Sequence, residues 1–296
     1  MSADLKVSVI GLDTSHAVEF PRRIQAPDCP KEQRVPGMHV EKCLRFLTPF
    51  TDEKILAERQ KQLEDWGIQV TEDFDEAVAG ADALILSIND ATYHLEYFER
   101  SVAVGVPIFL DKPMADSVES AQRIVDVADK HGTPFFTSSS LRFAPQMVQA
   151  GTEVLRPSQA AVYGPLGIAP AGSSILWYGV HSFEMLEGLL GTGAQEVTVI
   201  KDKQGVVVHV AYDDDRRGTV TLTEGVYQYG GVVRNDEVEF PFVVDSGTPY
   251  TELVEQMLGF FKGGPEPVMI NHSMEIMKLL IATQKSYDSG KTESLD

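Results

Sequence analysis

A lysine at the end of a predicted strand is the residue whose setting points most directly to chemistry. The apolar residues 109–110 run into the charged turn Asp111-Lys112-Pro113. Ser117 then has the type and position of a helix N-cap, and apolar residues follow it at helical spacing. In an open parallel sheet, ligands bind in the crevice outside the carboxyl ends of the strands. Lys112, fixed there beside a proline, is a candidate site residue, although a solvated lysine in a strand–helix turn has the same local pattern.

Several motifs resemble those of one known family. Residues 94–113, HLEYFERSVAVGVPIFLDKP, resemble the strand–helix–strand segment of the glucose-fructose oxidoreductase and inositol dehydrogenase (Gfo/Idh/MocA) family. In that family a histidine opens the helix and Glu-Lys-Pro follows the next strand, so Asp111 here replaces the glutamate. LRFAP at 141–145 and YGVHSFEML at 178–186 resemble the entry to the family's second domain and its Gly-x-His segment, and residues 250–295 resemble its closing helices. By their order and spacing, the chain is identified as a divergent member.

The resemblance implies hydride transfer between a nicotinamide and a carbon that bears a hydroxyl, with a sugar or polyol as the small-molecule substrate. Such a reaction needs one group to take the hydroxyl proton and another to hold that oxygen. By the resemblance, Lys112 orients the hydroxyl and relays the proton, and His181 is the base or its partner. Both are expected to face one cleft between two domains. Taken alone, His181 would equally be a helix-start or core histidine.

The residues around His181 depart from the family pattern. Four residues before it the family usually has an aspartate, and this chain has Trp177, whereas Glu184 preserves the acid three residues after it. Trp177 and Tyr178 offer flat apolar faces on which a sugar ring could stack, or they are packing residues. The candidate substrate-binding residues are Arg142, Trp177, Tyr178 and Glu184.

The expected dinucleotide-binding turn is degenerate. A predicted strand at residues 5–10 ends at Gly11, as in folds that bind NAD or NADP. The Gly-x-Gly-x-x-Gly turn needs its second glycine for approach to the pyrophosphate and its third for helix packing, and Asp13 and His16 replace them. Like charges at about 4 Å cost roughly 4 kcal/mol at an effective dielectric of 20, so we expect weak or displaced NAD(P) binding that Asp13→Gly tightens. Alternatively, Asp13 and Ser15 only cap the helix.

The end of the second predicted strand bears on the choice between NAD and NADP. An acidic residue there takes the ribose hydroxyls in NAD-binding folds, but residues 44–46 contain no acid and the next one is Asp52. Arg45 could instead meet a 2′-phosphate, which favours NADP, or be a solvated strand-end charge. The candidate cofactor-binding residues are Gly11, Asp13, Thr14, Ser15, His16, Arg45, Asn89, His94 and Asp111.

Two alternatives to a dehydrogenase remain open. The altered turn also fits a family member that has lost the cofactor and binds a sugar-like ligand without redox chemistry. Imidazole and carboxylate groups are good ligands for a divalent metal, so metal-assisted chemistry in the same cleft is the other alternative. The side chains that could approach one crevice are those of Asp13, His16, His94, Asp111, His181 and Glu184. Their spacing contains no recognisable metal motif, and we predict no metal ligands.

Composition excludes several classes of partner. The chain has 296 residues, with 25 basic and 44 acidic side chains and a net charge of -19. This charge repels phosphate backbones and anionic membrane surfaces, so neither nucleic acid nor a membrane is an expected partner. Cys29 and Cys43 cannot form a disulfide framework, and residues 1–6 lack the pattern of a signal peptide, so we predict a cytoplasmic protein. No apolar run approaches the roughly 20 residues of a membrane helix.

The order of predicted elements indicates two domains. Over residues 1–140, strands at 5–10, 38–47, 68–70, 83–88 and 134–137 alternate with helices at 53–66, 73–79 and 118–131, which predicts a Rossmann-like, doubly wound parallel sheet. Residues 21–38 contain four prolines and are predicted to be irregular. Over residues 141–296, alternating runs between 196 and 244 predict an α+β domain with an open, mainly antiparallel sheet. An uncovered sheet face predicts a homodimer or homotetramer.

Overall fold

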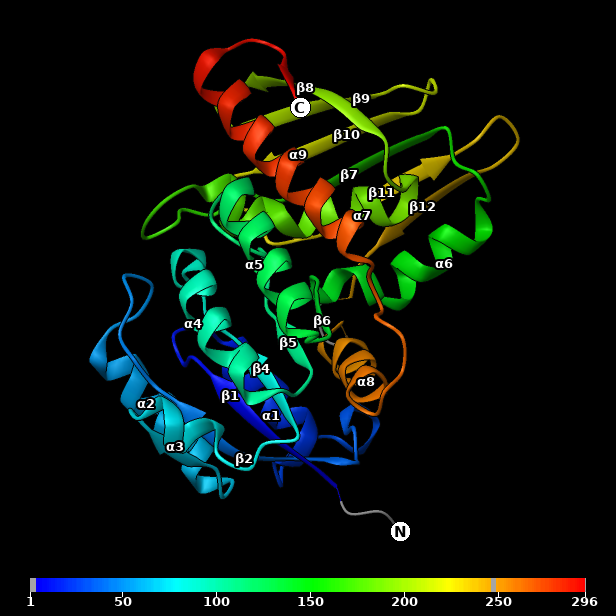
Figure 1. Cartoon of the computed structure of the whole chain (residues 1–296). Helices are drawn as coiled ribbons and strands as arrows, with labels where there is room; N and C mark the ends of the chain where they lie inside the picture. Colours follow the sequence, from blue (N-terminus) through cyan, green and yellow to red (C-terminus); the bar gives the residue numbers. More distant parts are fainter. Residues whose placement is uncertain (1–3, 246–248, 296) are drawn as a thin grey trace. The chain divides into compact units, whose positions relative to one another are not determined.

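The computed structural model describes residues 4–245 and 249–295, which form two compact units (Figure 1). The first unit comprises residues 1–137 and 250–269, and the second comprises residues 138–249 and 270–296. The chain therefore leaves the first unit, returns to it for one helix, and leaves it again. The predicted domain limits, 1–140 and 141–296, did not include this return.

The first unit is built on a parallel sheet of six strands in the order β3-β2-β1-β4-β5-β6. Its strands are β1 (Leu5–Ile10), β2 (Met38–Leu44), β3 (Gln69–Thr71), β4 (Ala83–Leu86), β5 (Ile108–Leu110) and β6 (Phe135–Thr137). Strands β4 and β5 are apolar and buried throughout, as expected for strands covered on both faces. The strand order reverses between β1 and β4, which is where such sheets bind ligands. The predicted Rossmann-like architecture is confirmed.

The helices of the first unit begin largely where the sequence predicted. They are α1 (His16–Gln25), α2 (Glu53–Asp65), α3 (Phe74–Val78), α4 (His94–Ser101), α5 (Val118–His131) and α8 (Pro249–Phe261). Ser117 accepts a hydrogen bond from the Ser120 amide at 3.1 Å, which confirms it as the N-cap of α5. The returning helix α8 packs its Phe260 ring edge-on against Phe136, with 5.1 Å between the ring centroids.

Two predicted elements near the N-terminus need correction. Strand β2 ends at Leu44 rather than at residue 47, because the chain then turns and brings the Thr48 hydroxyl to the carboxylate of Asp13. Helix α1 continues through Pro21 to Gln25, so the irregular segment predicted from residue 21 begins later. The burial of Phe20 and Ile24 on this helix offsets the backbone hydrogen bond that a proline removes.

The second unit contains a mixed sheet of seven strands in the order β12-β11-β7-β10-β9-β8-β13. Its strands are β7 (Gln159–Pro165), β8 (Ala194–Lys201), β9 (Gly205–Tyr212), β10 (Arg217–Thr223), β11 (Gly230–Arg234), β12 (Glu239–Val243) and β13 (Glu293–Ser294). Only β7 and β10 pair in parallel among the described residues, so the mainly antiparallel sheet is confirmed. Strand β7 lies outside the region in which strands were predicted.

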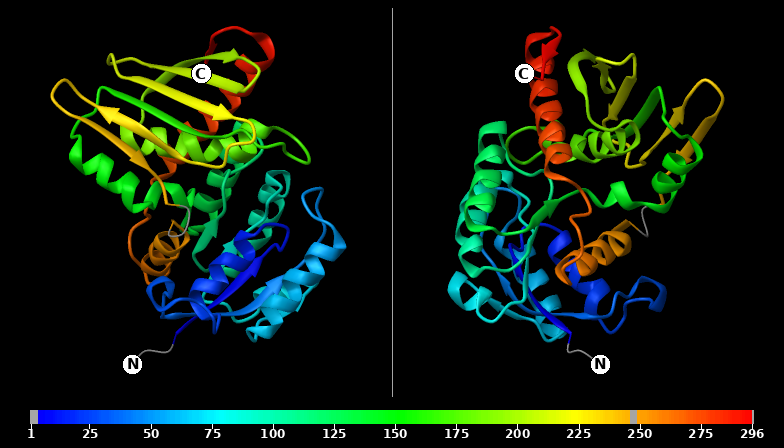
Figure 2. Two further views of the ribbon diagram at one scale, coloured as in Figure 1. Left: turned by 180° about the vertical axis from the view of Figure 1, so that it is seen from behind. Right: turned by 45° about the vertical axis from the view of Figure 1, so that its right-hand side comes forward.

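Helices cover one face of this second sheet (Figure 2). They are α6 (Pro145–Glu153), α7 (Val180–Leu190) and α9 (Ile270–Ser289), and a π-helical turn, Ile175–Gly179, leads into α7. Within residues 4–245 and 249–295, the opposite face of this sheet carries no helix. None of the helices in these described residues is both long and apolar enough to cross a membrane.

Candidate active site

The turn after β1 lies tightly against the end of β4. Gly11 has a φ of +105°, and a Cβ atom placed there would lie 2.5 Å from the carbonyl oxygen of Ser87. Only glycine combines this backbone conformation with so close an approach. The one glycine that remains of the dinucleotide fingerprint is therefore required by the local geometry.

Asp13 is turned into the protein. Its Oδ1 atom accepts the Asn89 amide at 2.8 Å, and its Oδ2 atom accepts the Asp90 amide at 3.3 Å and the Thr48 hydroxyl at 2.7 Å. The residue is 1% exposed, and burial raises the pKa of its carboxyl group while these three donors oppose the rise. The carboxylate ties the β1 turn to the segment after β4, and its closeness to a bound phosphate stays a prediction.

A cation lies beside the same turn. Arg59 of α2 donates from Nη1 to the carbonyl oxygen of Leu12 at 2.9 Å. Its positive charge also interacts with Asp13, although burial lowers the pKa of the guanidinium. The negative charge of Asp13, which replaces the second glycine, is thus partly balanced by the positive charge of Arg59.

His16 and Asp111 form a buried pair between α1 and the end of β5. The Nδ1 atom of His16 lies 2.6 Å from Oδ2 of Asp111, and the imidazole packs against the rings of Phe20 and Tyr250. Burial alone would raise the pKa of Asp111, but the charge and hydrogen bond of His16, with Lys112, lower it to about 2. His16, which replaces the third glycine of the fingerprint, is therefore the partner of Asp111, the carboxylate of the predicted Asp-Lys-Pro turn.

Lys112 is buried next to this pair. Only 6% of the residue is exposed, and its backbone amide donates to Oδ1 of Asp111 at 2.8 Å. Burial lowers the pKa of its ammonium group, against the opposing influence of Asp111 and Asp13. A buried lysine whose pKa is lowered gives up its proton more readily than a solvated lysine does.

Three other predicted cofactor residues have mainly structural contacts. His94 is fully buried, and its ring nitrogens lie 2.8 Å from the Ile88 carbonyl oxygen and 3.2 Å from that of Met114. The Thr14 hydroxyl accepts the His16 amide at 3.3 Å. Ser15 is the exposed N-cap of α1 and makes no side-chain capping bond.

Arg45 is surrounded by acceptors. Its guanidinium donates to Gln60 at 2.5 Å, pairs with Glu53, and lies 3.6 Å from a carboxylate oxygen of Glu72. The side chain is 13% exposed. Arg45 is therefore not a solvated strand-end charge, because two carboxylates balance it; that it meets a 2′-phosphate stays a prediction.

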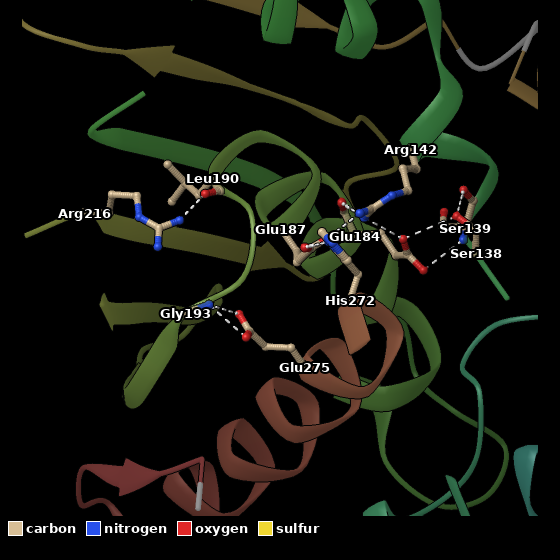
Figure 3. A network of polar contacts seen from close by, with 10 residues as sticks. All are labelled: Ser138, Ser139, Arg142, Glu184, Glu187, Leu190, Gly193, Arg216, His272 and Glu275. Atoms are coloured by element: carbon tan, nitrogen blue, oxygen red, sulfur yellow. Dashed lines mark hydrogen bonds and ion pairs between the residues drawn. The ribbon is translucent and has the colours of Figure 1, made fainter. Parts of the chain in front are cut away.

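In the second unit, Arg142 and Glu184 meet inside the protein (Figure 3). The Glu184 carboxylate accepts from Arg142 at 3.2 Å and from the Ser139 amide at 3.1 Å. Burial, and to a lesser extent Glu187, raise the pKa of Glu184 to about 7 although Arg142 opposes the shift. Arg142 also pairs with Glu187, which lies 2.5 Å from Nδ1 of His272. These two predicted substrate-binding residues thus form part of a buried network.

His181 stands at the start of α7, partly exposed, among aromatic rings. Its Nδ1 atom lies 2.6 Å from the Ser139 hydroxyl, and its ring is edge-on to Tyr178 and Tyr229 at 6.4 and 5.6 Å between centroids. Trp177 packs edge-on against Tyr178 at 4.6 Å. His181, Trp177 and Tyr178 are therefore brought together, and that they face a substrate stays a prediction.

The structure gathers the predicted residues into one cluster in each unit. The first contains Asp13, His16, Asn89, Asp111 and Lys112, and the second contains Arg142, Trp177, Tyr178, His181 and Glu184. That Lys112 and His181 act on one substrate stays a prediction. In the part of the chain that the structure describes, no group of three His, Cys, Asp or Glu side chains is placed to hold a metal ion.

The comparisons with known proteins agree with this architecture. Residues 51–139 match the GFO_IDH_MocA family model, described as an oxidoreductase family with an NAD-binding Rossmann fold. No curated protein matches the sequence significantly. The match assigns an NAD-binding Rossmann fold of an oxidoreductase family to residues 51–139. The predicted resemblance to the Gfo/Idh/MocA family is confirmed over these residues.

Solved structures share the fold of the whole chain. GenD2 from gentamicin A biosynthesis, in complex with NAD, has 15% identity and a TM-score of 0.81 over 100% of this chain and 97% of its own. Scyllo-inositol dehydrogenase from Lactobacillus casei, with NAD(H) and scyllo-inositol, has 12% identity and a TM-score of 0.80 over 99% of both chains. Myo-inositol 2-dehydrogenase from Lactobacillus plantarum has 12% identity and a TM-score of 0.80 over 99% of this chain and 100% of its own.

Proposed function

We propose that this protein is an NAD-dependent dehydrogenase that acts on a hydroxyl group of a sugar or polyol. The observation that carries the proposal is Lys112, a buried lysine at the carboxyl end of β5, next to the point where the strand order of a Rossmann sheet reverses. The family description, oxidoreductase with an NAD-binding Rossmann fold, supports the reaction class. The inositol dehydrogenases among the structural neighbours support a polyol substrate.

The turn after β1 fits a dinucleotide despite its altered sequence. Because the Asp13 carboxylate is buried on internal donors, it does not present its charge to a phosphate as the sequence suggested. The N-terminus of α1 follows the turn, and helix N-termini bind phosphate through amides and the helix dipole. Arg59, bonded to the Leu12 carbonyl, adds positive charge beside the turn. A bound nicotinamide would supply the hydride acceptor.

NAD fits the end of β2 better than NADP. A 2′-phosphate adds negative charge, and Arg45 is already paired with Glu53 and lies 3.6 Å from Glu72. A phosphate at this position would have to displace these carboxylates or lie beside them. We therefore infer that NADP binds more weakly than NAD.

Lys112 and His181 are proposed to handle the substrate oxygen. Burial lowers the pKa of the Lys112 amine, which suits it to accept and return a proton. Trp177 and Tyr178, half-buried beside His181, offer aromatic faces for stacking a sugar or polyol ring. Arg142 and Glu184 are proposed to support these groups and not to touch the substrate, because they bond to each other and Glu184 bonds to the segment before α6.

Ligand binding without a nicotinamide is the alternative function. It is favoured by one observation: the His16 ring fills the position of the third glycine and is locked to Asp111. Whether NAD, NADH or NADP stabilises the protein against thermal unfolding decides between the two functions.

The uncovered face of the second sheet suggests a homodimer or homotetramer. Outward positions of β9 and β10 include Val207, paired with Thr221, and His209, paired with Thr219. Ile200 on β8 is 64% exposed. In a chain of net charge -19, these mostly neutral side chains are suited to face a second copy of the same surface.

The proposed function is tested by binding and then by turnover. Thermal unfolding is measured with NAD, NADH and NADP, where a ligand at about 100 times its dissociation constant adds roughly 2.7 kcal/mol of stability. Scyllo-inositol, myo-inositol and a panel of sugars are then oxidised while NADH absorbance is followed. Lys112→Met, which keeps the length of the side chain but removes the amine, should bind NAD and lose at least about a hundredfold in kcat. Failure of every dinucleotide to bind would refute the proposal and favour the alternative.

A further inference from the structure

A pocket in the second unit plays no part in the proposed function. Its volume is about 380 Å³, and it is lined by the loop between β7 and Ile175, by Glu224 after β10, and by Gln284 and Tyr287 of α9. All of these residues belong to the second unit, and none is a predicted substrate or cofactor residue. Small-molecule sites have volumes of about 300–1,000 Å³, so this pocket is large enough for a ligand with one ring.

The loop that forms one wall of the pocket is held in place by the protein itself. The hydroxyl of Ser173 donates to Oε1 of Gln284 at 2.5 Å. The backbone of Gly167 approaches the ring of Tyr178 so closely that a Cβ atom at this position would lie 2.3 Å from Cδ2 of the ring. The wall is therefore formed before a ligand binds, which lowers the entropy cost of binding.

Apolar side chains form part of the lining. Leu166 and Ile175 line the pocket, although they are only 8% and 2% exposed. Contact with them stabilises the carbon frame of a bound ligand through burial of apolar surface. This contact does not depend on the charge of the ligand, so the polar groups of the lining must supply the selectivity.

Three polar groups of the lining are not fully paired. Within residues 4–245 and 249–295, the carboxylate of Glu224 has no hydrogen bond or ion pair, and the hydroxyl of Tyr287 has no hydrogen-bond partner. The hydroxyl oxygen of Ser174 accepts the amide of Ala169 at 3.0 Å, but its proton has no acceptor in the same residues. The pocket thus offers one carboxylate and two hydroxyl groups to a ligand.

The charge of the lining favours a cation. No basic side chain is among the described residues that line the pocket, whereas Glu224 is a carboxylate. The ammonium group of Lys201 lies 3.9 Å from the centroid of the Tyr287 ring, so this ring already holds a cation and Tyr287 offers its hydroxyl instead. An ammonium group has three protons to donate, so it can bond to the carboxylate and to hydroxyl oxygens together. An anion would be repelled by Glu224 and by the net charge of -19.

We propose that this pocket binds a small organic amine in its ammonium form. The ammonium group pairs with Glu224, and the carbon frame of the amine rests on Leu166 and Ile175. This site goes beyond the proposed dehydrogenase function, because it needs neither NAD nor Lys112.

A ligand in this pocket lies against the segment that carries Trp177 and Tyr178. Ile175 lines the pocket and begins the π-helical turn that contains both aromatic residues. Gly167, which also lines the pocket, contacts the Tyr178 ring. Binding is therefore expected to change the fluorescence of Trp177. This change is measured in Trp66→Phe, because the chain has two tryptophans.

Calorimetry on the full-length protein without NAD tests the proposal. Two matched pairs of probes are titrated at neutral pH: cyclohexylamine against cyclohexanol, and glucosamine against glucose. Within each pair, a hydroxyl group replaces the amino group and the carbon frame is unchanged. The amine of each pair should bind at least about fivefold more tightly than its neutral partner, the effect of one partly exposed ion pair. Equal binding within both pairs, or no binding of either amine at millimolar concentration, would overturn the proposal.

Matched variants place the amine in this pocket. Glu224→Gln keeps the shape of the side chain and removes its charge, so it should weaken cyclohexylamine binding by roughly 3- to 10-fold and leave cyclohexanol binding unchanged. Glu237→Gln is the control, because Glu237 is also exposed but does not line the pocket. An equal loss in both variants would refute the site, because the amine would then respond only to net charge. These titrations contain no NAD, so their outcome is independent of NAD binding.

Discussion

Replacement of Asp13 by alanine should unfold the first unit more easily and should not improve NAD binding. The carboxylate accepts from the amides of Asn89 and Asp90 and from the hydroxyl of Thr48. Alanine leaves these donors without their acceptor, and an unpaired buried donor costs about 1–3 kcal/mol. Burial raises the pKa of Asp13, so the charge itself is costly and its removal returns part of that loss.

The expected net loss is about 3–5 kcal/mol, because the three donors lie in one network and their contributions are not additive. For a unit of this size, each kcal/mol lowers Tm by about 2–4 °C, so Tm should fall by about 6–20 °C. Calorimetric thermal unfolding and urea titration measure this change. Thr48→Val removes one donor and should cost about 1 kcal/mol. Asp28→Ala, at an exposed position, should stay within about 0.5 kcal/mol of wild type.

Isothermal calorimetry with NAD on Asp13→Gly completes the test. Since the carboxylate is buried on three internal donors, we expect glycine to leave the affinity unchanged or to weaken it through a looser turn. A variant that keeps wild-type stability and binds NAD much more tightly would show that the carboxylate lies in the phosphate site, as the sequence first suggested.

Three further results are expected. Gly11→Ala should cost at least about 3 kcal/mol in urea unfolding, because its Cβ would lie 2.5 Å from the Ser87 carbonyl oxygen at a φ of +105°, and a stable variant would contradict this. The pKa of Glu184 rises from 4.5 to about 7 on folding, so between these pH values the folded state holds a proton that the unfolded state releases. The free energy of unfolding should therefore fall by about 3 kcal/mol as pH rises from about 4.5 to 7. Urea titrations of Glu184→Gln should lack this pH dependence. Val207→Lys on the open sheet face should give a monomer in light scattering, and an unchanged mass would place the interface elsewhere.

The architecture was predictable because its signals are local. Alternating strands and helices with recognisable caps predict the parallel sheet. Helix α5 has the predicted limits, because Ser117 and the apolar spacing after it both lie within a few residues of the boundary. Strand β7 was missed because it lies in a stretch rich in glycine and proline, where pairing with β10 and β11 overrides weak strand propensity.

The site was only partly predictable because its decisive contacts are long-range. The sequence shows that Asp13 and His16 replace glycines of the dinucleotide-binding turn. It does not show that Asp13 bonds to the segment after β4, or that His16 bonds to Asp111, 95 residues away. Ser139 stood in a visible run of three serines, yet its pairing with His181 depends on how α7 packs against that segment. Sequence alone therefore does not separate a charge that binds a ligand from one whose partner is distant in the chain.

The return of the chain to the first unit has a consequence for its biosynthesis. Helix α8 supplies Tyr250, packed against His16 and Phe20, and Phe260, packed against Phe136, and it follows the whole sheet of the first unit by more than 100 residues. At about 5–20 residues per second, the ribosome needs roughly 7–26 seconds to extend the chain from residue 137 to residue 269. During that time the side chains that α8 contacts in the finished fold, among them Phe20 and Phe136, lack that helix as a packing partner.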